Sequence, residues 1–118
     1  MCVLDQEGKR LLELLVSNFG RVTPGRPETY ITYREVHERL NLPLSGNTYG
    51  TSLQHQGLTS LADWTAYKKL PGITGLIVKQ DDRMPGSGYF ELFGKQNTDF
   101  HWWKNEIKKS IEFDWSTV

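Results

Sequence analysis

Apolar residues recur at helical spacing near the start of the chain, with charged residues between them. The apolar positions are Leu4, Leu11, Leu12, Leu15 and Phe19. This spacing predicts an amphipathic helix over residues 5–18, which Gly20 stops. Residues 23–27 contain two prolines and a glycine, so they predict a loop.

Residues 29–31 are expected to form a short extended segment. The next residues carry a pattern typical of the start of a helix. Thr32 and Glu35 form the capping-box pattern, in which each side chain satisfies a backbone N–H. We therefore expect a short helix with Val36 and Leu40 on its inner face, ended by residues 41–43. Gly46 and Asn47 predict a turn, and residues 48–56 predict a second short helix that buries Tyr49 and Leu53.

The second half of the chain reads as a helix, two strands and a final helix. Residues 60–63 repeat the capping-box pattern before a helix carrying Leu61 and Trp64. Residues 73–79 and 89–93 are rich in β-branched and aromatic side chains and predict strands, with turn-forming residues at 80–88. Residues 97–99 cap the last helix, whose apolar stripe and trailing aromatics are Phe100, Trp103, Ile107, Ile111, Phe113 and Trp115.

This order of elements predicts one α+β domain over residues 1–118 with a winged-helix-like fold. In that fold, a helix-turn-helix is followed by a β-hairpin, and helices flank it at the N- and C-termini.

Composition narrows the function classes. The chain has 118 residues, with 14 Lys and Arg against 14 Asp and Glu, so DNA binding requires a local basic face. Cys2 is the only cysteine, which excludes a disulfide framework and a cysteine-based metal site. No apolar run reaches the ~18 residues of a membrane span, and Asp5 and Glu7 do not suit a signal peptide. We expect a cytoplasmic protein with no membrane partner.

The predicted helix at 48–56 carries the functional hypothesis. Its outward side chains are uncharged hydrogen-bonding groups, although Lys and Glu form solvated helices better. In a helix-turn-helix this second helix enters the major groove of DNA, where Asn and Gln pair with adenine. The expected base-reading residues are Asn47, Thr48, Thr51, Gln54 and His55, with Ser52 and Gln56 also outward. A short polar surface segment without function is the alternative.

Phosphate contacts require cations beside such a helix. The candidates are Arg34, Arg39, Lys68, Lys69 and Arg83. Asp81 and Asp82 weaken the contribution of Arg83, because carboxylates repel phosphate. The alternative for these residues is a solvated surface charge.

Two family resemblances follow from these residues. Residues 30–36 and 47–53, YITYREV and NTYGTSL, resemble the winged-helix DNA-binding part of alkylguanine-DNA alkyltransferases and alkyltransferase-like proteins. The chain lacks that family's Pro-Cys-His-Arg motif and its reader-helix arginine, so alkyl transfer is excluded. Residues 70–78 and 84–90, together with 102–106 and 113–115, are similar to small domains attached to HNH-type and modification-dependent restriction endonucleases and other prokaryotic defence proteins. This second resemblance implies a DNA-recognition or scaffolding module, with a nuclease domain as a possible neighbour.

The sequence contains no recognisable catalytic or metal-binding pattern. The three histidines form no metal-binding pair, and His37, between Glu35 and Glu38, is expected on the surface. Phe93 stands where a restriction-type nuclease needs lysine after Glu91. We therefore expect no enzyme activity, metal or cofactor. The alternative function is a small protein-binding inhibitor or adaptor, such as a phage anti-defence protein, with Trp102 and Trp115 as contact residues. The sequence does not predict the oligomeric state.

Overall fold

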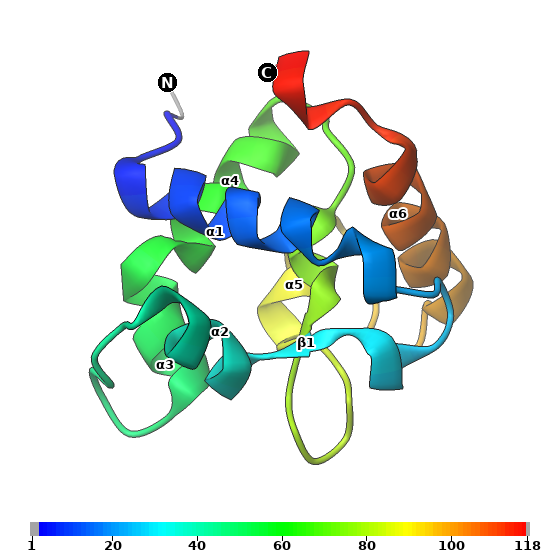
Figure 1. The fold of residues 1–118 in the computed structure, drawn as a ribbon. Helices are drawn as coiled ribbons and strands as arrows, with labels where there is room; N and C mark the ends of the chain where they lie inside the picture. The colour runs from blue at the N-terminus through cyan, green and yellow to red at the C-terminus, as the bar shows by residue number, and fades with distance from the viewer. Residues whose placement is uncertain (1–2, 118) are drawn as a thin grey trace.

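The structure, a computed structural model, describes residues 3–117, so Cys2 lies outside it. It is a small, mostly helical α+β domain with a two-stranded parallel sheet (Figure 1). The helices are α1 (Gln6–Ser17), α2 (Tyr33–Leu40), α3 (Tyr49–Leu53), α4 (Thr59–Tyr67), α5 (Ser87–Leu92) and α6 (Phe100–Glu112). The strands are β1 (Ile31–Thr32) and β2 (Ile77–Val78). None of the helices within residues 3–117 is long and apolar enough to cross a membrane.

The first helix confirms the amphipathic pattern. Asp5 caps α1 by accepting a hydrogen bond from the Gly8 N–H, 2.7 Å away. Leu11 and Leu15 are fully buried, and they join one hydrophobic core to which all six α-helices contribute.

The predicted β-hairpin is wrong. Ile77–Val78 pairs in parallel with Ile31–Thr32, and residues 73–76 form a 3₁₀ turn in place of the expected strand. The second expected strand, residues 89–93, lies within and just after helix α5. Tyr89 and Phe90 are adjacent in sequence and both are buried, which a strand packed on one face does not allow. Tertiary packing therefore overrides the β-propensity of this aromatic run.

The second predicted helix is shorter than expected. Thr48 caps α3 by accepting from the Thr51 N–H, but regular helix ends at Leu53. A π-helical segment, Gln54–Leu58, then leads into α4 with non-helical angles at Gln56 and Gly57. Gly57 has φ +124°, and a Cβ there would lie 2.8 Å from the Glu7 carbonyl oxygen of α1. The close approach of this glycine to α1 breaks the helix.

Helix α4 begins at Thr59, two residues before the Leu61 start that a Ser60 cap implies, and it has no side-chain cap. The expected capping box at Ser60–Asp63 is therefore wrong. The Ser60 hydroxyl accepts instead from the Asp5 N–H at 3.1 Å, which ties the start of α4 to the start of α1.

Aromatic rings of α5 and α6 pack against one another. Trp103 is buried as predicted, and its indole N–H donates to the Gly75 carbonyl at 3.0 Å. Tyr30 meets the Trp103 ring edge-on at 5.6 Å. Phe100, predicted on the same buried stripe, is 54% exposed because it lies at the first residue of α6, beyond the edge of the core.

Candidate functional site

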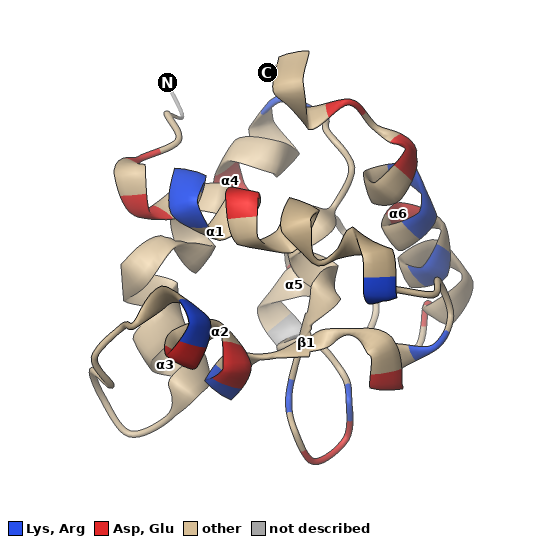
Figure 2. Ribbon diagram, viewed as in Figure 1, with Lys and Arg blue, Asp and Glu red and all other residues tan. Residues whose placement is uncertain are grey.

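Helix α3 and the segments before and after it in the chain carry no formal charge. Residues 40–62 contain no Asp, Glu, Lys or Arg, and Figure 2 shows α3 and the loop before it without a coloured residue. We call the exposed side chains of residues 41–55 the polar face. Its hydrogen-bonding members include all the predicted base-reading residues: Asn47, Thr48, Thr51, Gln54 and His55.

These five side chains differ in whether they already make hydrogen bonds within the protein. The Thr48 hydroxyl caps α3 and donates to the Thr51 hydroxyl at 3.0 Å. The side chains of Asn47, Gln54 and His55 make no hydrogen bond within residues 3–117. Asn47, Gln54 and His55 therefore form the available part of the face.

Two residues expected at the surface are buried beneath this face instead. Ser52 is fully buried and His37 is 3% exposed, so the outward placement of both is wrong. The Tyr33 carbonyl accepts from the His37 Nδ1–H at 2.9 Å, which leaves Nε2 to accept from the Ser52 hydroxyl at 2.8 Å. A buried imidazole is tolerated here because both ring nitrogens are hydrogen-bonded.

The Ser52 hydroxyl also holds the loop before α3. It accepts from the Ser45 N–H at 2.9 Å and from the Gln56 side-chain amide at 2.9 Å. The Gln56 amide also donates to the Pro43 carbonyl at 2.9 Å, so this predicted outward residue faces the loop. Together these bonds fix α3 and residues 43–45 against α2. Tyr49, which we expected in the core, lies at its margin, 36% exposed and edge-on to His37.

The nearest predicted phosphate contacts lie on α2, and both are ion-paired. Arg34 contacts Glu38 at 3.1 Å, and Arg39 contacts Glu35 at 3.4 Å. Arg21 also bonds Glu35 at 2.9 Å, and this hydrogen bond is the main reason that the pKa of Glu35 lies below its usual value. Exposed pairs of this kind contribute about 0–1 kcal/mol each, so a phosphate can compete for these arginines.

The other predicted phosphate contacts are not gathered at α3. Lys68 follows the far end of α4, a helix about 13 Å long, and lines an apolar groove with Val3 and Trp115. Lys69 is its exposed neighbour, and Arg83 lies in the turn after β2, where Lys79 pairs with Asp82 at 3.0 Å. Figure 2 shows these basic segments away from the uncharged loop.

The two tryptophans of the alternative hypothesis are differently placed. Trp102 is half-buried against the rings of Tyr89, Phe90 and Phe93. Trp115 is 8% exposed, and its indole N–H donates to the Ser110 carbonyl at 2.7 Å. Trp115 is therefore part of the core and presents no exposed anchor.

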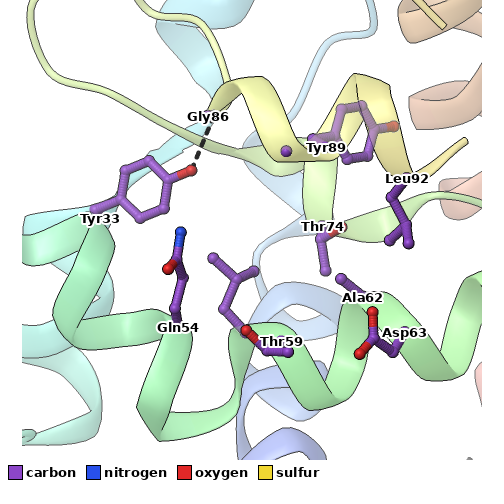
Figure 3. A pocket seen from close by; sticks show the side chains of 11 residues that line it. Tyr33, Gln54, Thr59, Ala62, Asp63, Thr74, Gly86, Tyr89 and Leu92 are labelled. Carbon is purple, nitrogen blue, oxygen red and sulfur yellow. Dashed lines mark hydrogen bonds between the residues drawn. The ribbon is translucent and has the colours of Figure 1, made fainter. Parts of the chain in front are cut away.

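A pocket that the sequence did not reveal lies next to the polar face. It has a volume of about 170 Å³ and is bordered by α2, the Gln54–Leu58 segment, α4, the 3₁₀ turn at 73–76 and α5 (Figure 3). Thr74 is 4% exposed and its hydroxyl has no hydrogen-bond partner within the described residues. The only feature of the sequence that could have indicated this pocket is Thr74, whose hydroxyl interrupts the apolar residues 73–78.

The Tyr33 hydroxyl lies at the rim of this pocket. It accepts a hydrogen bond from the Gly86 N–H at 3.0 Å, and burial raises the pKa of the phenol. The phenol is thus protonated at neutral pH, and its own proton is available to a ligand.

No group of three His, Cys, Asp or Glu side chains among residues 3–117 is arranged to hold a metal ion. No family model, curated protein or solved structure matches this chain.

Proposed function

We propose that this chain is a DNA-binding module that contacts DNA with the polar face around α3. The observation that carries this proposal is the exposed set Asn47, Gln54 and His55, which make no internal hydrogen bonds and lie in a segment, residues 40–62, without acidic residues. Amide and imidazole groups of this kind hydrogen-bond to base edges in the major groove. The buried His37–Ser52 contact supports the proposal, because it holds these groups in one arrangement before binding.

The helix-turn-helix interpretation belongs to this proposal. Helix α2 would lie across the backbone and the N-terminal part of α3 would approach the groove. The connection, residues 41–48, is longer than the usual 3–4-residue turn, and α3 has five residues. We therefore expect few base contacts. No wing is proposed, since β2 pairs with β1 and the second strand expected for the wing lies in and just after helix α5.

The positions of the cations predict weak, modestly salt-dependent binding. Arg34 and Arg39 are on α2, which packs directly on α3, and we assign them the phosphate contacts. Two neutralised phosphates give a slope of about −2 in log affinity against log salt concentration. Affinity should then fall about tenfold between 50 and 200 mM salt. We leave Lys68 and Lys69 out of the contact surface because they follow the far end of α4.

A fluorescence-anisotropy titration of labelled duplexes of several sequences at these two salt concentrations tests the proposal. The variant Asn47→Ala/Gln54→Ala should lose discrimination between sequences more than it loses average affinity. The variant Asn105→Ala/Gln96→Ala removes the same two exposed residue types elsewhere and should behave like the parent chain. No binding at 50 mM salt, or an equal loss on every duplex, would refute the assignment.

A protein partner at the same face is the second candidate. Leu44 is 54% exposed and Tyr49 36% exposed beside the hydrogen-bonding residues, and the cores of protein interfaces are depleted in charge. This candidate predicts no measurable affinity for any duplex. The resemblance of residues 70–78 and 84–90 to small domains of restriction endonucleases leads us to propose a nuclease domain or another prokaryotic defence protein as that partner.

A further inference from the structure

We propose that the pocket bordered by Tyr33, Gln54, Asp63 and Thr74 binds a small planar molecule that carries N–H donors, such as a carboxamide, an amidine or an amino-substituted ring. This inference goes beyond the proposed DNA contact, because it concerns a cavity that shares only Gln54 with the DNA-contacting side chains, and it requires no DNA.

The size of the cavity limits the ligand. Its volume is about 170 Å³, below the 300–1,000 Å³ of pockets for drug-sized molecules. A single substituted ring fits this space. Side chains of Leu58, Ala62, Leu92 and Tyr89 supply apolar contact area around such a ring.

Thr74 provides the strongest sign of a ligand site. Its side chain points into the pocket in Figure 3, and its hydroxyl is buried without a partner within the described residues. Buried hydroxyls nearby are satisfied: Tyr89 donates to the Gly72 carbonyl at 2.9 Å, and Thr65 donates to the Ala62 carbonyl at 2.8 Å. A ligand that hydrogen-bonds Thr74 would offset the desolvation penalty of this unpartnered hydroxyl.

The charge of the lining selects the type of ligand. Asp63 is the only acidic or basic side chain that lines the pocket within residues 3–117. Figure 3 shows Asp63 and Gln54 on the same wall, with the Gln54 amide directed toward Tyr33. A carboxylate repels anions and accepts hydrogen bonds from N–H groups, while the Gln54 amide both donates and accepts. The lining therefore disfavours phosphates and carboxylates and favours neutral or cationic N–H donors.

Three probes of nearly identical shape test this charge preference: benzamidine, benzamide and benzoate. Isothermal titration calorimetry should detect binding in the order benzamidine, then benzamide, with no binding of benzoate. Benzoate binding as tight as benzamidine, or no binding of either N–H probe at millimolar concentration, would overturn the proposal.

Two variants separate the contributions of the lining. Thr74→Val keeps the shape but removes the hydroxyl, so it should weaken benzamide binding about three- to tenfold while leaving the melting temperature equal or higher. Asp63→Asn, at an exposed position of α4, should remove the preference for benzamidine over benzamide. Thr98→Val, at an exposed threonine outside the pocket, is the control and should change neither affinity. Unchanged affinities in both pocket variants would overturn the proposal.

The outcome is independent of the proposed function. Loss of DNA binding in Asn47→Ala with the probe affinities intact affects only the polar face. Loss of probe binding in Thr74→Val with DNA binding intact affects only the pocket.

Discussion

Two regions of the molecule hold their helices together by different means. In the polar corner, formed by α2, residues 41–48 and α3, a buried histidine and serine join the elements through hydrogen bonds of 2.8–2.9 Å. In the aromatic half, formed by Tyr30, α5 and α6, rings meet at centroid distances such as 5.4 Å and 5.6 Å. Hydrogen bonds fix one geometry, whereas aromatic packing mainly contributes buried area. The corner that presents the proposed contact residues is thus the directionally constrained one.

The largest effect should come from the glycine that joins the polar corner to α1. Gly57→Ala introduces a Cβ 2.8 Å from the Glu7 carbonyl oxygen at a residue with φ +124°. Backbone strain and displacement of α1 should cost about 3 kcal/mol. Urea denaturation measures this loss. Gly20→Ala, with no atom within 4 Å of the new Cβ, is the control and should lose little. Equal stabilities would contradict the close contact with α1.

The hydrogen bonds of the polar corner should give the next largest effect. Ser52→Ala removes the hydroxyl shared by His37, the Ser45 N–H and Gln56, so it should cost about 2 kcal/mol. Thr51→Ala changes the neighbouring exposed position and should cost less than about 1 kcal/mol. Thermal denaturation of both variants tests the difference. A Ser52 variant as stable as the Thr51 variant would show that the corner does not depend on this network.

Loss of the Tyr89 hydroxyl in the aromatic half should change the free energy of unfolding less at neutral pH than the loss of Ser52. Its effect should depend on pH in the alkaline range. Tyr89→Phe removes the hydrogen bond to the Gly72 carbonyl and should cost about 1 kcal/mol. Burial raises the pKa of Tyr89 well above 10.0, so its folded phenol stays protonated while the unfolded one ionises. This contribution is complete below pH 10 and declines as the pH rises above it. The parent chain should therefore lose more stability than Tyr89→Phe between pH 9 and pH 11. Parallel losses in denaturation experiments would contradict this assignment.

The smallest change in stability should come from the exposed ion pairs of α2. Glu35→Gln releases Arg21 and Arg39 and should cost less than about 1 kcal/mol at pH 7. The lowered pKa of Glu35 means that its contribution is present above its usual pKa and is lost as the pH falls through the lowered value. The same variant should bind DNA several-fold more tightly, because it removes a carboxylate beside the arginines. Weaker DNA binding by Glu35→Gln, measured by anisotropy, would argue against phosphate contacts at α2.

Local sequence patterns predicted correctly those helices for which the local preference and the tertiary packing favour the same structure. Helix α1 follows its leucine spacing and its Asp5 cap, and α2 begins at Thr32 as the capping residue indicates. The aromatic run at residues 89–93 wrongly predicted a strand, because Tyr89 and Phe90 both face the core from consecutive positions of a helix. His37 and Ser52 were placed outside because their burial depends on a contact 15 residues apart. The pocket around Thr74 escaped prediction for the same reason, since its lining comes from separate segments.

The most direct test of DNA recognition by the polar face is an NMR titration of the ¹⁵N-labelled chain with a short duplex. The account predicts that the amide signals of residues 47–55 and the side-chain amides of Asn47 and Gln54 shift progressively with added DNA. The signals of Lys68, Lys69 and α6 should remain in place. Shifts centred on α6 or on Lys68 and Lys69, with the signals of residues 47–55 unchanged, would contradict it.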